Sequence, residues 1–275
     1  MKKHWITILL FGILIIGLSL MLYPTAADWW NSYRQSQVVS GYMDEVTKMS
    51  DETYEATLNQ ALTYNQSLLE HPNDLEMTPP QWERYEKLLN LGGYGVMGYV
   101  DIPKIGITAP IYHGTSEQVL QRAIGHLEWS ALPVGGEGTH CVLSGHRGLP
   151  SARLFTDLDV MAVGDTFSLC VLNEELIYEV DQIRIVKPDE VEELFPVKGQ
   201  DYCTLTTCTP YGINSHRILV RGHRIENLQS KSQRVTADAV QLEPILVAPF
   251  AAMPMLLALL IAILIPKKKN RRKGK

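Results

Sequence analysis

The sequence predicts a mainly β domain that follows a helical segment and lies between two apolar membrane spans. Three observations support this class. Short strand-like runs separated by turns fill residues 96–226, apolar residues recur at helical spacing within residues 28–95, and an uncharged run stands near each end of the chain. The 45% hydrophobic content is enough for a packed core and excludes a disordered chain.

The first element is the apolar run near the start of the chain. Residues 5–23 carry no charge, and a bilayer-spanning helix needs about 20 apolar residues. We expect residues 1–27 to form an uncleaved membrane anchor. A cleaved signal peptide is the alternative, because Thr25, Ala26 and Ala27 are small residues of the kind that a signal peptidase accepts.

Residues 28–95 are expected to be a helical segment. An apolar stripe with spacings of three and four includes Val39, Tyr42 and Val46, and Ser50 is the expected N-cap of a second helix. Pro72 ends that helix, since the residue before a proline disfavours helical geometry. A short last helix is predicted over residues 81–90.

Residues 96–226 are predicted to form the strand domain. About seven or eight short strands in roughly 130 residues favour a closed or nearly closed barrel, or a sandwich. The predicted strands include residues 97–102, 109–112, 140–144, 166–171, 176–185, 201–207 and 217–224.

The C-terminal part contains a polar linker, a second span and a basic tail, over residues 227–244, 245–265 and 266–275. Nine of the 25 Lys and Arg residues lie at the two ends, so the middle carries 16 basic against all 30 acidic residues, a net −14. The acidic middle argues against nucleic-acid binding. The positive-inside rule predicts that both ends are cytoplasmic if the N-terminal segment is uncleaved, and that the middle is extracellular.

The four cysteines differ in their sequence context. Cys141, Cys170 and Cys203 lie in apolar strand patterns and are expected to be buried, although an even count in an exported protein leaves a disulfide as the alternative. Cys208 ends a strand before a Pro and Gly turn, where a nucleophilic thiol can be both exposed and held rigidly. A thiol needs a base or cation to become a nucleophile at neutral pH.

Two residues are candidates for that role. His146 stands in a Gly-flanked loop after a strand, and Arg217 follows Cys208 by nine residues in a hairpin-like connection. A guanidinium stays charged at any working pH and can stabilise an oxyanion. Spacing alone leaves open a turn histidine and a solvated strand arginine.

The run Thr204-Leu205-Thr206-Thr207-Cys208 resembles the TLxTC signature of sortases, with His146 and Arg217 at the family's histidine and arginine positions. Residues 111–116, 125–136, 144–150, 154–158 and 208–214 resemble class C, pilus-assembling sortases. The resemblance implies an eight-stranded sortase-type β-barrel with an N-terminal helical segment and two flanking transmembrane helices. It also implies catalytic Cys208, His146 and Arg217, with Ser144, Thr206 and Thr207 as candidates for the substrate groove.

The resemblance implies a cysteine transpeptidase that needs neither a cofactor nor a metal. It would cleave an LPxTG-like sorting signal between Thr and Gly, form a thioacyl-enzyme and transfer the chain to a lysine amine of another pilin subunit. Pilin subunits and the membrane are thus the expected partners. Two alternatives stay open at this point: a housekeeping sortase that attaches proteins to cell-wall precursor, and a non-catalytic membrane-tethered binding domain.

The chain departs from the class C pattern in the loop at residues 72–77. Class C sortases usually carry a lid there, with an Asp-Pro-aromatic motif that covers the active site. Asp74 is present but Leu75 follows it, so Asp74 and Leu75 are the lid candidates. A solvated loop is the equally weighted alternative.

Overall fold

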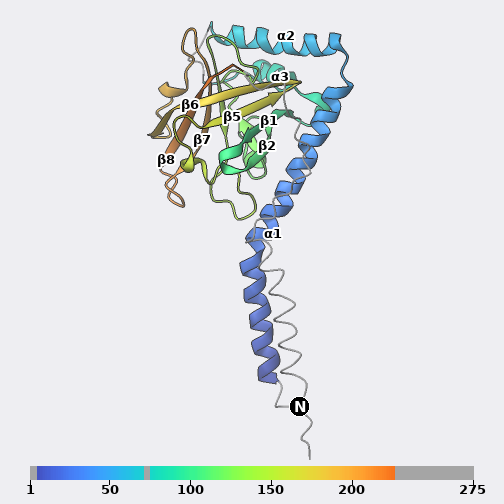
Figure 1. Cartoon of the computed structure of the whole chain (residues 1–275), viewed down its shortest axis with the longest axis vertical. Helices are drawn as coiled ribbons and strands as arrows, with labels where there is room; N and C mark the ends of the chain where they lie inside the picture. The colour runs from blue at the N-terminus through green and yellow to red at the C-terminus, as the bar shows by residue number, and fades with distance from the viewer. Residues whose placement is uncertain (1–4, 71–74, 227–275) are drawn as a thin grey trace, which may run out of the picture. The chain divides into compact units, whose positions relative to one another are not determined.

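The computed structural model describes residues 5–70 and 75–226. The chain forms two compact units, one of residues 1–25 with 231–275 and one of residues 26–230. The predicted linker at 227–244, the second span at 245–265 and the tail at 266–275 lie outside the described residues. The second unit contains the whole strand domain, whose elements are labelled in Figure 1.

Helix α1 (Trp5–Lys48) contains the first predicted span. Its N-terminal part is long and apolar enough to cross a bilayer, and none of that apolar window is buried against protein. It is therefore a candidate membrane anchor. The helix continues through Pro24, so the boundary expected after residue 27 falls inside one helix.

Helices α2 (Asp51–Leu68) and α3 (Pro79–Lys87) follow. Ser50 caps α2 as predicted, because its hydroxyl oxygen accepts a hydrogen bond from the Thr53 N–H at 3.2 Å. Helix α3 begins two residues before the predicted start. The reason is that Pro79 and Pro80 occupy its first turn, where a missing N–H costs nothing.

The strands form a closed barrel in the order β1-β2-β3-β4-β7-β8-β6-β5, counted over the described residues. This confirms the predicted eight-stranded β-barrel that follows a helical N-terminal segment. Pairs β2–β3 and β4–β7 are parallel, and the other neighbours are antiparallel. The strands are β1 (Val96–Ile102), β2 (Ile107–His113), β3 (Ile124–His126), β4 (Thr139–Ser144), β5 (Thr166–Val171), β6 (Glu174–Val186), β7 (Asp201–Thr209) and β8 (His216–Arg224).

Strand β3 was not predicted from the sequence. It has three residues, which is too short for an alternating pattern to stand out. Its place comes from long-range pairing, since Ile124 pairs with Ile111 of β2 and Gly125 pairs with Ser144 of β4. The short helix α4 (Glu117–Leu120) forms part of the connection from β2 to β3.

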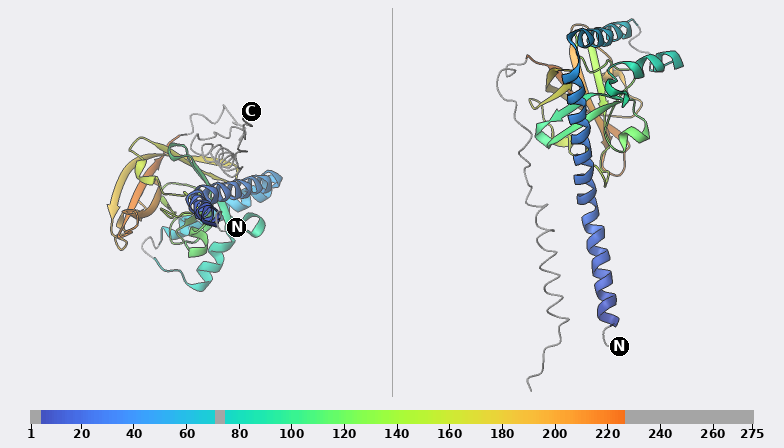
Figure 2. Two further views of the ribbon diagram at one scale, coloured as in Figure 1. Left: turned by 90° about the horizontal axis from the view of Figure 1, so that it is seen from below. Right: turned by 90° about the vertical axis from the view of Figure 1, so that its right-hand side faces the viewer.

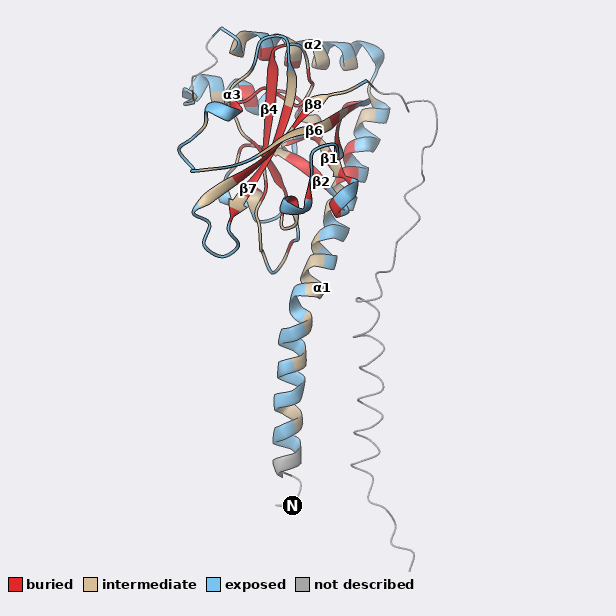
Figure 3. Ribbon diagram, turned by 60° about the vertical axis from the view of Figure 1, so that its left-hand side comes forward, coloured by how far each residue is buried: buried red, intermediate tan, exposed pale blue. Residues whose placement is uncertain are grey.

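The main core fills the barrel, where the strands are coloured as buried in Figure 3. Leu143 of β4, Leu205 of β7 and Val220 of β8 belong to it. Alternate residues of β4 and β8 form a second, smaller cluster with a residue of the β6–β7 connection. Its buried members are Val142, Leu194 and Leu219, and partly buried Leu127, Trp129 and Val186 pack on it. Strands β4, β7 and β8 are therefore covered on both faces.

Buried hydrogen bonds attach the helices to the barrel. The Tyr42 hydroxyl of α1 donates to the Met97 carbonyl at 2.9 Å and accepts from the Leu172 N–H at 2.7 Å. Asn65 of α2 exchanges two hydrogen bonds with the backbone of Leu132, at 2.7 and 3.1 Å. Tyr85 of α3 is fully buried. Figures 1 and 2 show α2 lying across one end of the barrel.

We expect Tyr42→Phe to lower the free energy of unfolding by about 1–3 kcal/mol, because it leaves the buried Leu172 N–H without an acceptor. The measurement is urea unfolding of the detergent-solubilised full-length protein. Tyr33→Phe is the control, since the Tyr33 side chain is half exposed, and it should change the value by less than about 0.5 kcal/mol. Equal effects would show that the Tyr42 hydroxyl does not hold α1 in place.

Candidate active site

The candidate site begins with the registers of β4, β7 and β8. Parallel pairing places Ser144 of β4 beside Thr206 of β7, and antiparallel pairing places Leu219 of β8 on its other side. Directly paired residues project to the same face of a sheet, and side chains two residues apart share that face. Thr206 and Cys208 therefore lie on the face of the smaller hydrophobic cluster, which is the outer face of the barrel.

Cys208 and Arg217 are direct partners in the β7–β8 ladder. Their Cβ atoms are consequently neighbours, about 4.5–5.5 Å apart in such pairs. Both side chains are half-buried. The Arg217 guanidinium donates to the carbonyls of Asn214 at 3.3 Å and His216 at 3.1 Å, so the β7–β8 turn holds it.

His146 reaches the same place by extension of the β4–β7 pairing. It stands two residues after Ser144, as Cys208 stands two residues after Thr206. The Gly145 N–H continues the ladder by donating to the Thr206 carbonyl at 3.2 Å. Gly145 is required for this close approach, because a Cβ there would lie 2.7 Å from Ile124 and 2.8 Å from Phe155. Backbone pairing thus brings Cys208, Arg217 and the loop that carries His146 to one edge of the barrel.

The structure separates the three predicted groove residues. Ser144 and Thr206 are direct pairing partners on the outer face, and Cys208 follows Thr206 by two residues along β7. Thr206 is buried, and its hydroxyl has no hydrogen-bond partner within the described residues. Thr207 projects to the opposite face, where its hydroxyl donates to the Gly145 carbonyl at 2.7 Å. Its contact is with the backbone that precedes His146.

The His146 side chain has a neighbour that the sequence analysis did not select. Its Nε2 atom lies 3.6 Å from Oε2 of Glu117, at the start of α4. Nε2 is buried and makes no hydrogen bond to any described residue. No local motif joins Glu117 to His146, since 29 positions separate them, and only the folding of β3 between β2 and β4 brings them together.

The four cysteines separate by environment. All are free thiols, and they all lie in the described part of the chain. Cys141 and Cys203 face each other across β4 and β7 and are buried as predicted, while Cys170 is only partly buried. Burial raises the pKa of Cys203 well above its usual value and that of Cys170 to about 11. Hydrogen bonds from Cys203 and His126 lower the pKa of Cys141 to about 6, but Cys141, like Cys203, is buried in the core. Cys208, half-buried at the end of β7, is therefore the better placed nucleophile.

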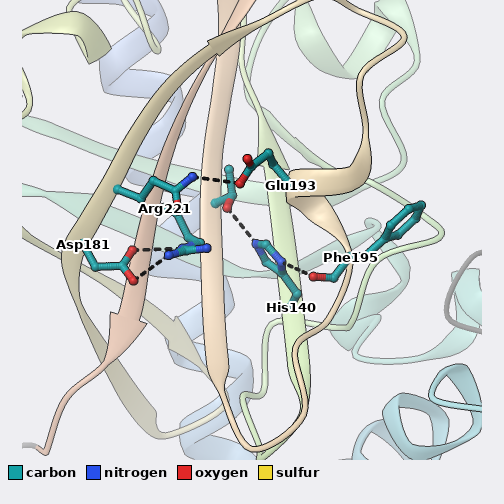
Figure 4. A network of polar contacts seen from close by, with 7 residues as sticks. His140, Asp181, Glu193, Phe195 and Arg221 are labelled. Carbon is teal, nitrogen blue, oxygen red and sulfur yellow. Dashed lines mark hydrogen bonds and ion pairs between the residues drawn. The ribbon is translucent and has the colours of Figure 1, made fainter.

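A polar network lies further along the outer face (Figure 4). His140 Nδ1 lies 3.1 Å from the Phe195 carbonyl, and its Nε2 lies 2.7 Å from the Thr204 hydroxyl. Burial lowers the pKa of His140 to about 4, so the ring is neutral at pH 7. Beside it, Arg221 donates two hydrogen bonds to Asp181, at 2.9 and 3.0 Å. The contact of His140 with Phe195 holds the β6–β7 connection over the outer face, and the Arg221–Asp181 pair joins β8 to β6.

The structure describes only one of the two lid candidates, Leu75. Asp74 lies outside the described residues. Leu75 is exposed, and Met77 is partly buried against the main core. The described part of this loop, residues 75–77, forms no hydrogen bond or ion pair with Cys208, His146 or Arg217.

The assembled groups suit acyl transfer. A thiol supplies the nucleophile, an imidazole moves protons, and a guanidinium stabilises negative charge on oxygen. These are the kinds of group that acyl transfer through a covalent intermediate uses.

Comparisons with known proteins agree with this chemistry. Residues 100–225 match the family model described as the sortase domain. Sortase C1 of Streptococcus agalactiae is 52% identical, with a TM-score of 0.68 over 70% of this chain and 99% of that one. Sortase C of Streptococcus pneumoniae, whose structure is described as informative on catalysis and pilin substrate specificity, is 45% identical, with a TM-score of 0.63 over 69% and 97%.

A curated relative, sortase D of Bacillus subtilis, is 30% identical over 131 residues. That match covers 46% of this chain and 63% of the relative, so the chain spans a little under two thirds of that protein's length.

We expect Thr207→Val to lower the free energy of unfolding by about 1–3 kcal/mol, because it strips the buried Gly145 carbonyl of its donor. It should also slow alkylation of Cys208 by iodoacetamide, since the loop that carries His146 loses its anchor. Thr206→Val is the matched control and should be neutral or stabilising, because the Thr206 hydroxyl has no partner among the described residues. Equal losses in both variants would contradict the assignment.

His140 should make stability depend on pH. Its pKa is lower in the folded protein than the usual 6.5 of an unfolded chain, so the unfolded state binds the extra proton. The contribution is therefore fully present above pH 6.5 and is lost as pH falls towards 4, by up to about 3 kcal/mol. Urea unfolding between pH 7.5 and 4.5 measures it. His140→Gln should show a smaller pH dependence than the wild type, and an unchanged dependence would contradict this account.

Proposed function

This chain belongs to the sortase family, and we propose that it is a membrane-anchored cysteine transpeptidase that polymerises pilin subunits. The proposed substrate is an LPxTG-like sorting signal, cleaved between Thr and Gly. The proposed acceptor is a lysine amine of another pilin subunit. The observation that carries the reaction type is the register that brings Cys208, Arg217 and the His146 loop to one edge of the barrel.

We assign the first half-reaction to Cys208 and His146. The Cys208 sulfur forms a bond to the Thr carbonyl carbon, and the Thr–Gly C–N bond breaks. His146 gives its proton to the leaving amine, so that the amine departs neutral. Arg217 stabilises the negative charge that develops on the carbonyl oxygen, or positions the substrate.

The second half-reaction reverses these roles. The acceptor lysine amine attacks the thioester carbonyl, a new isopeptide C–N bond forms, and the C–S bond breaks. His146 takes the proton that the amine loses, and the thiol of Cys208 is regenerated. An amine must compete with water at this stage, which a partly dry groove favours. The buried neighbours Thr206 and Leu219 contribute to such a groove.

Pilin polymerisation is preferred over attachment to cell-wall precursor because of the relatives. The solved structures reported above are C-type sortases at 45–52% identity. The helical segment before the barrel also fits that class. A housekeeping sortase would use the same three residues, so the product distinguishes them: covalent ladders of pilin, or single proteins joined to wall peptide. A non-catalytic binding domain is disfavoured because Cys, His and Arg stand at all three positions.

The proposed topology places the barrel outside the cell. The apolar part of α1 is one anchor and residues 245–265 are proposed as a second. Lys2 and Lys3 stand at one end and seven basic residues follow position 266. If the N-terminal segment is uncleaved, the positive-inside rule supports a cytoplasmic location for both termini. The barrel domain at 96–226 then acts close to the membrane, where anchored substrates arrive.

The test is a transpeptidation assay with the full-length enzyme in detergent. The substrates are a fluorescent peptide containing LPxTG and a pilin that carries the acceptor lysine. Cys208→Ala should abolish both cleavage and ladder formation, because no thioacyl-enzyme forms. Cys203→Ala, which removes a buried thiol from the core, should retain activity in the folded fraction. Equal loss in both variants would mean that Cys208 acts through folding and not as the nucleophile.

A further inference from the structure

Glu117 is held beside the candidate site by the way β3 is inserted into the barrel. Strand β3 lies between β2 and β4, with Gly125 paired to Ser144 at the end of β4. A Cβ on Gly125 would lie 2.5 Å from the Gly114 carbonyl and 3.1 Å from Leu120, so glycine lets the β2–α4 connection press against β3. The connection thereby reaches the end of β4, where the chain continues to His146.

The backbone that leads to Glu117 is itself anchored. The Gly114 N–H donates to the hydroxyl of buried Tyr85 at 3.0 Å. Ser116 then precedes α4, and Glu117 is its first residue. On the other oxygen of the carboxylate, Oε1 accepts a hydrogen bond from Nε2 of Gln121. The carboxylate is thus oriented by its own helix, with Oε2 directed to His146.

One nitrogen of the His146 imidazole lies next to the Glu117 carboxylate. Nε2 lies 3.6 Å from Oε2 of Glu117 and is buried without a hydrogen bond to any other described residue. The hydrogen bond from Gln121 lowers the pKa of Glu117, so the carboxylate is ionised at neutral pH. Arg217 is the ladder partner of Cys208, and Arg147, the residue after His146, pairs with Asp159.

We propose that Glu117 is a positioning residue for the sortase reaction, holding His146 through Nε2 so that Nδ1 exchanges protons with Cys208 and the substrate amine. The inference rests on the proposed function for the role of His146. A carboxylate on one imidazole nitrogen fixes the ring orientation and stabilises its protonated form, which is the role of the third member in catalytic triads. Here, the proton that leaves the Cys208 thiol goes to Nδ1 and later to the leaving amine. Glu117 accepts no proton in either step.

The expected effect of Glu117 on the reaction rate follows from how exposed the Glu117 and His146 side chains are. The Glu117 side chain is 69% exposed and that of His146 is 27% exposed, so solvent screens their attraction. Surface pairs of this kind correspond to rate changes of about 1.4- to 5-fold. A screened pair also weakens at high ionic strength, whereas a contact that works through packing does not.

The experiment uses a charge series at position 117 in the full-length enzyme. Glu117→Asp, Glu117→Gln and Glu117→Lys are compared with Glu83→Gln, which removes an equally exposed carboxylate that pairs with Lys87 on α3. Two rates are measured: alkylation of Cys208 by iodoacetamide, followed by mass spectrometry of the Cys208 peptide, and kcat and KM for cleavage of an LPxTG peptide.

We expect both the alkylation rate and kcat to fall from the wild type through Glu117→Asp and Glu117→Gln to Glu117→Lys. The decrease in Glu117→Gln should be about 2- to 5-fold, and KM should not change. The decrease in both rates in Glu117→Gln should be smaller in 1 M NaCl. The control Glu83→Gln should have the same rates as the wild type. The proposal would be overturned if Glu117→Gln and Glu117→Lys had wild-type rates. It would also be overturned if the Asp, Gln and Lys variants all lost the same fraction of alkylation rate and kcat. Because alkylation needs no substrate, an ordered alkylation series in an enzyme that cleaves no sorting peptide would support Glu117 and reject the proposed function.

Discussion

The pairing registers of three strands are the constraint on which the candidate site depends. Strand β7 runs parallel to β4 and antiparallel to β8, so each outward residue of β7 has a fixed neighbour on both sides. A slip of one residue would turn Cys208 into the barrel and bring buried Cys203 to the groove face. The packing of Leu143, Leu205 and Val220 inside the barrel opposes that slip, because it would expose the core.

Both faces of these strands are buried, which has a consequence for the chemistry. The inner face fills the barrel, and the outer face supports Leu194 and the β6–β7 connection. Cys208 therefore stands at the end of a rigid, doubly covered strand, and the proposed partners Arg217 and His146 come from a strand and a loop held by backbone hydrogen bonds. Such mounting keeps reacting groups in place without relying on the long side chains themselves.

Much of this arrangement could be predicted from the sequence. The helical N-terminal segment, the cap at Ser50 and most strands follow from periodicity and turn residues. Cys208, His146 and Arg217 were selected by local context and by resemblance to sortases, and the registers now place them together. Local context could not find β3, which has three residues, or Glu117, which meets His146 only after β2, β3 and β4 have paired. The resemblance to sortases offered Thr207 as a groove candidate, whereas alternation along β7 turns that side chain to the opposite face.

The central claim is that the thiol of Cys208 carries the acyl group. Its most direct measurement is mass spectrometry of the enzyme after incubation with an LPxTG-containing peptide, without an amine acceptor. The account predicts an adduct equal to the peptide up to its Thr, joined as a thioester to Cys208 and removed by hydroxylamine. An adduct on Cys141, Cys170 or Cys203, or cleavage of the peptide with no covalent intermediate on any cysteine, would contradict it.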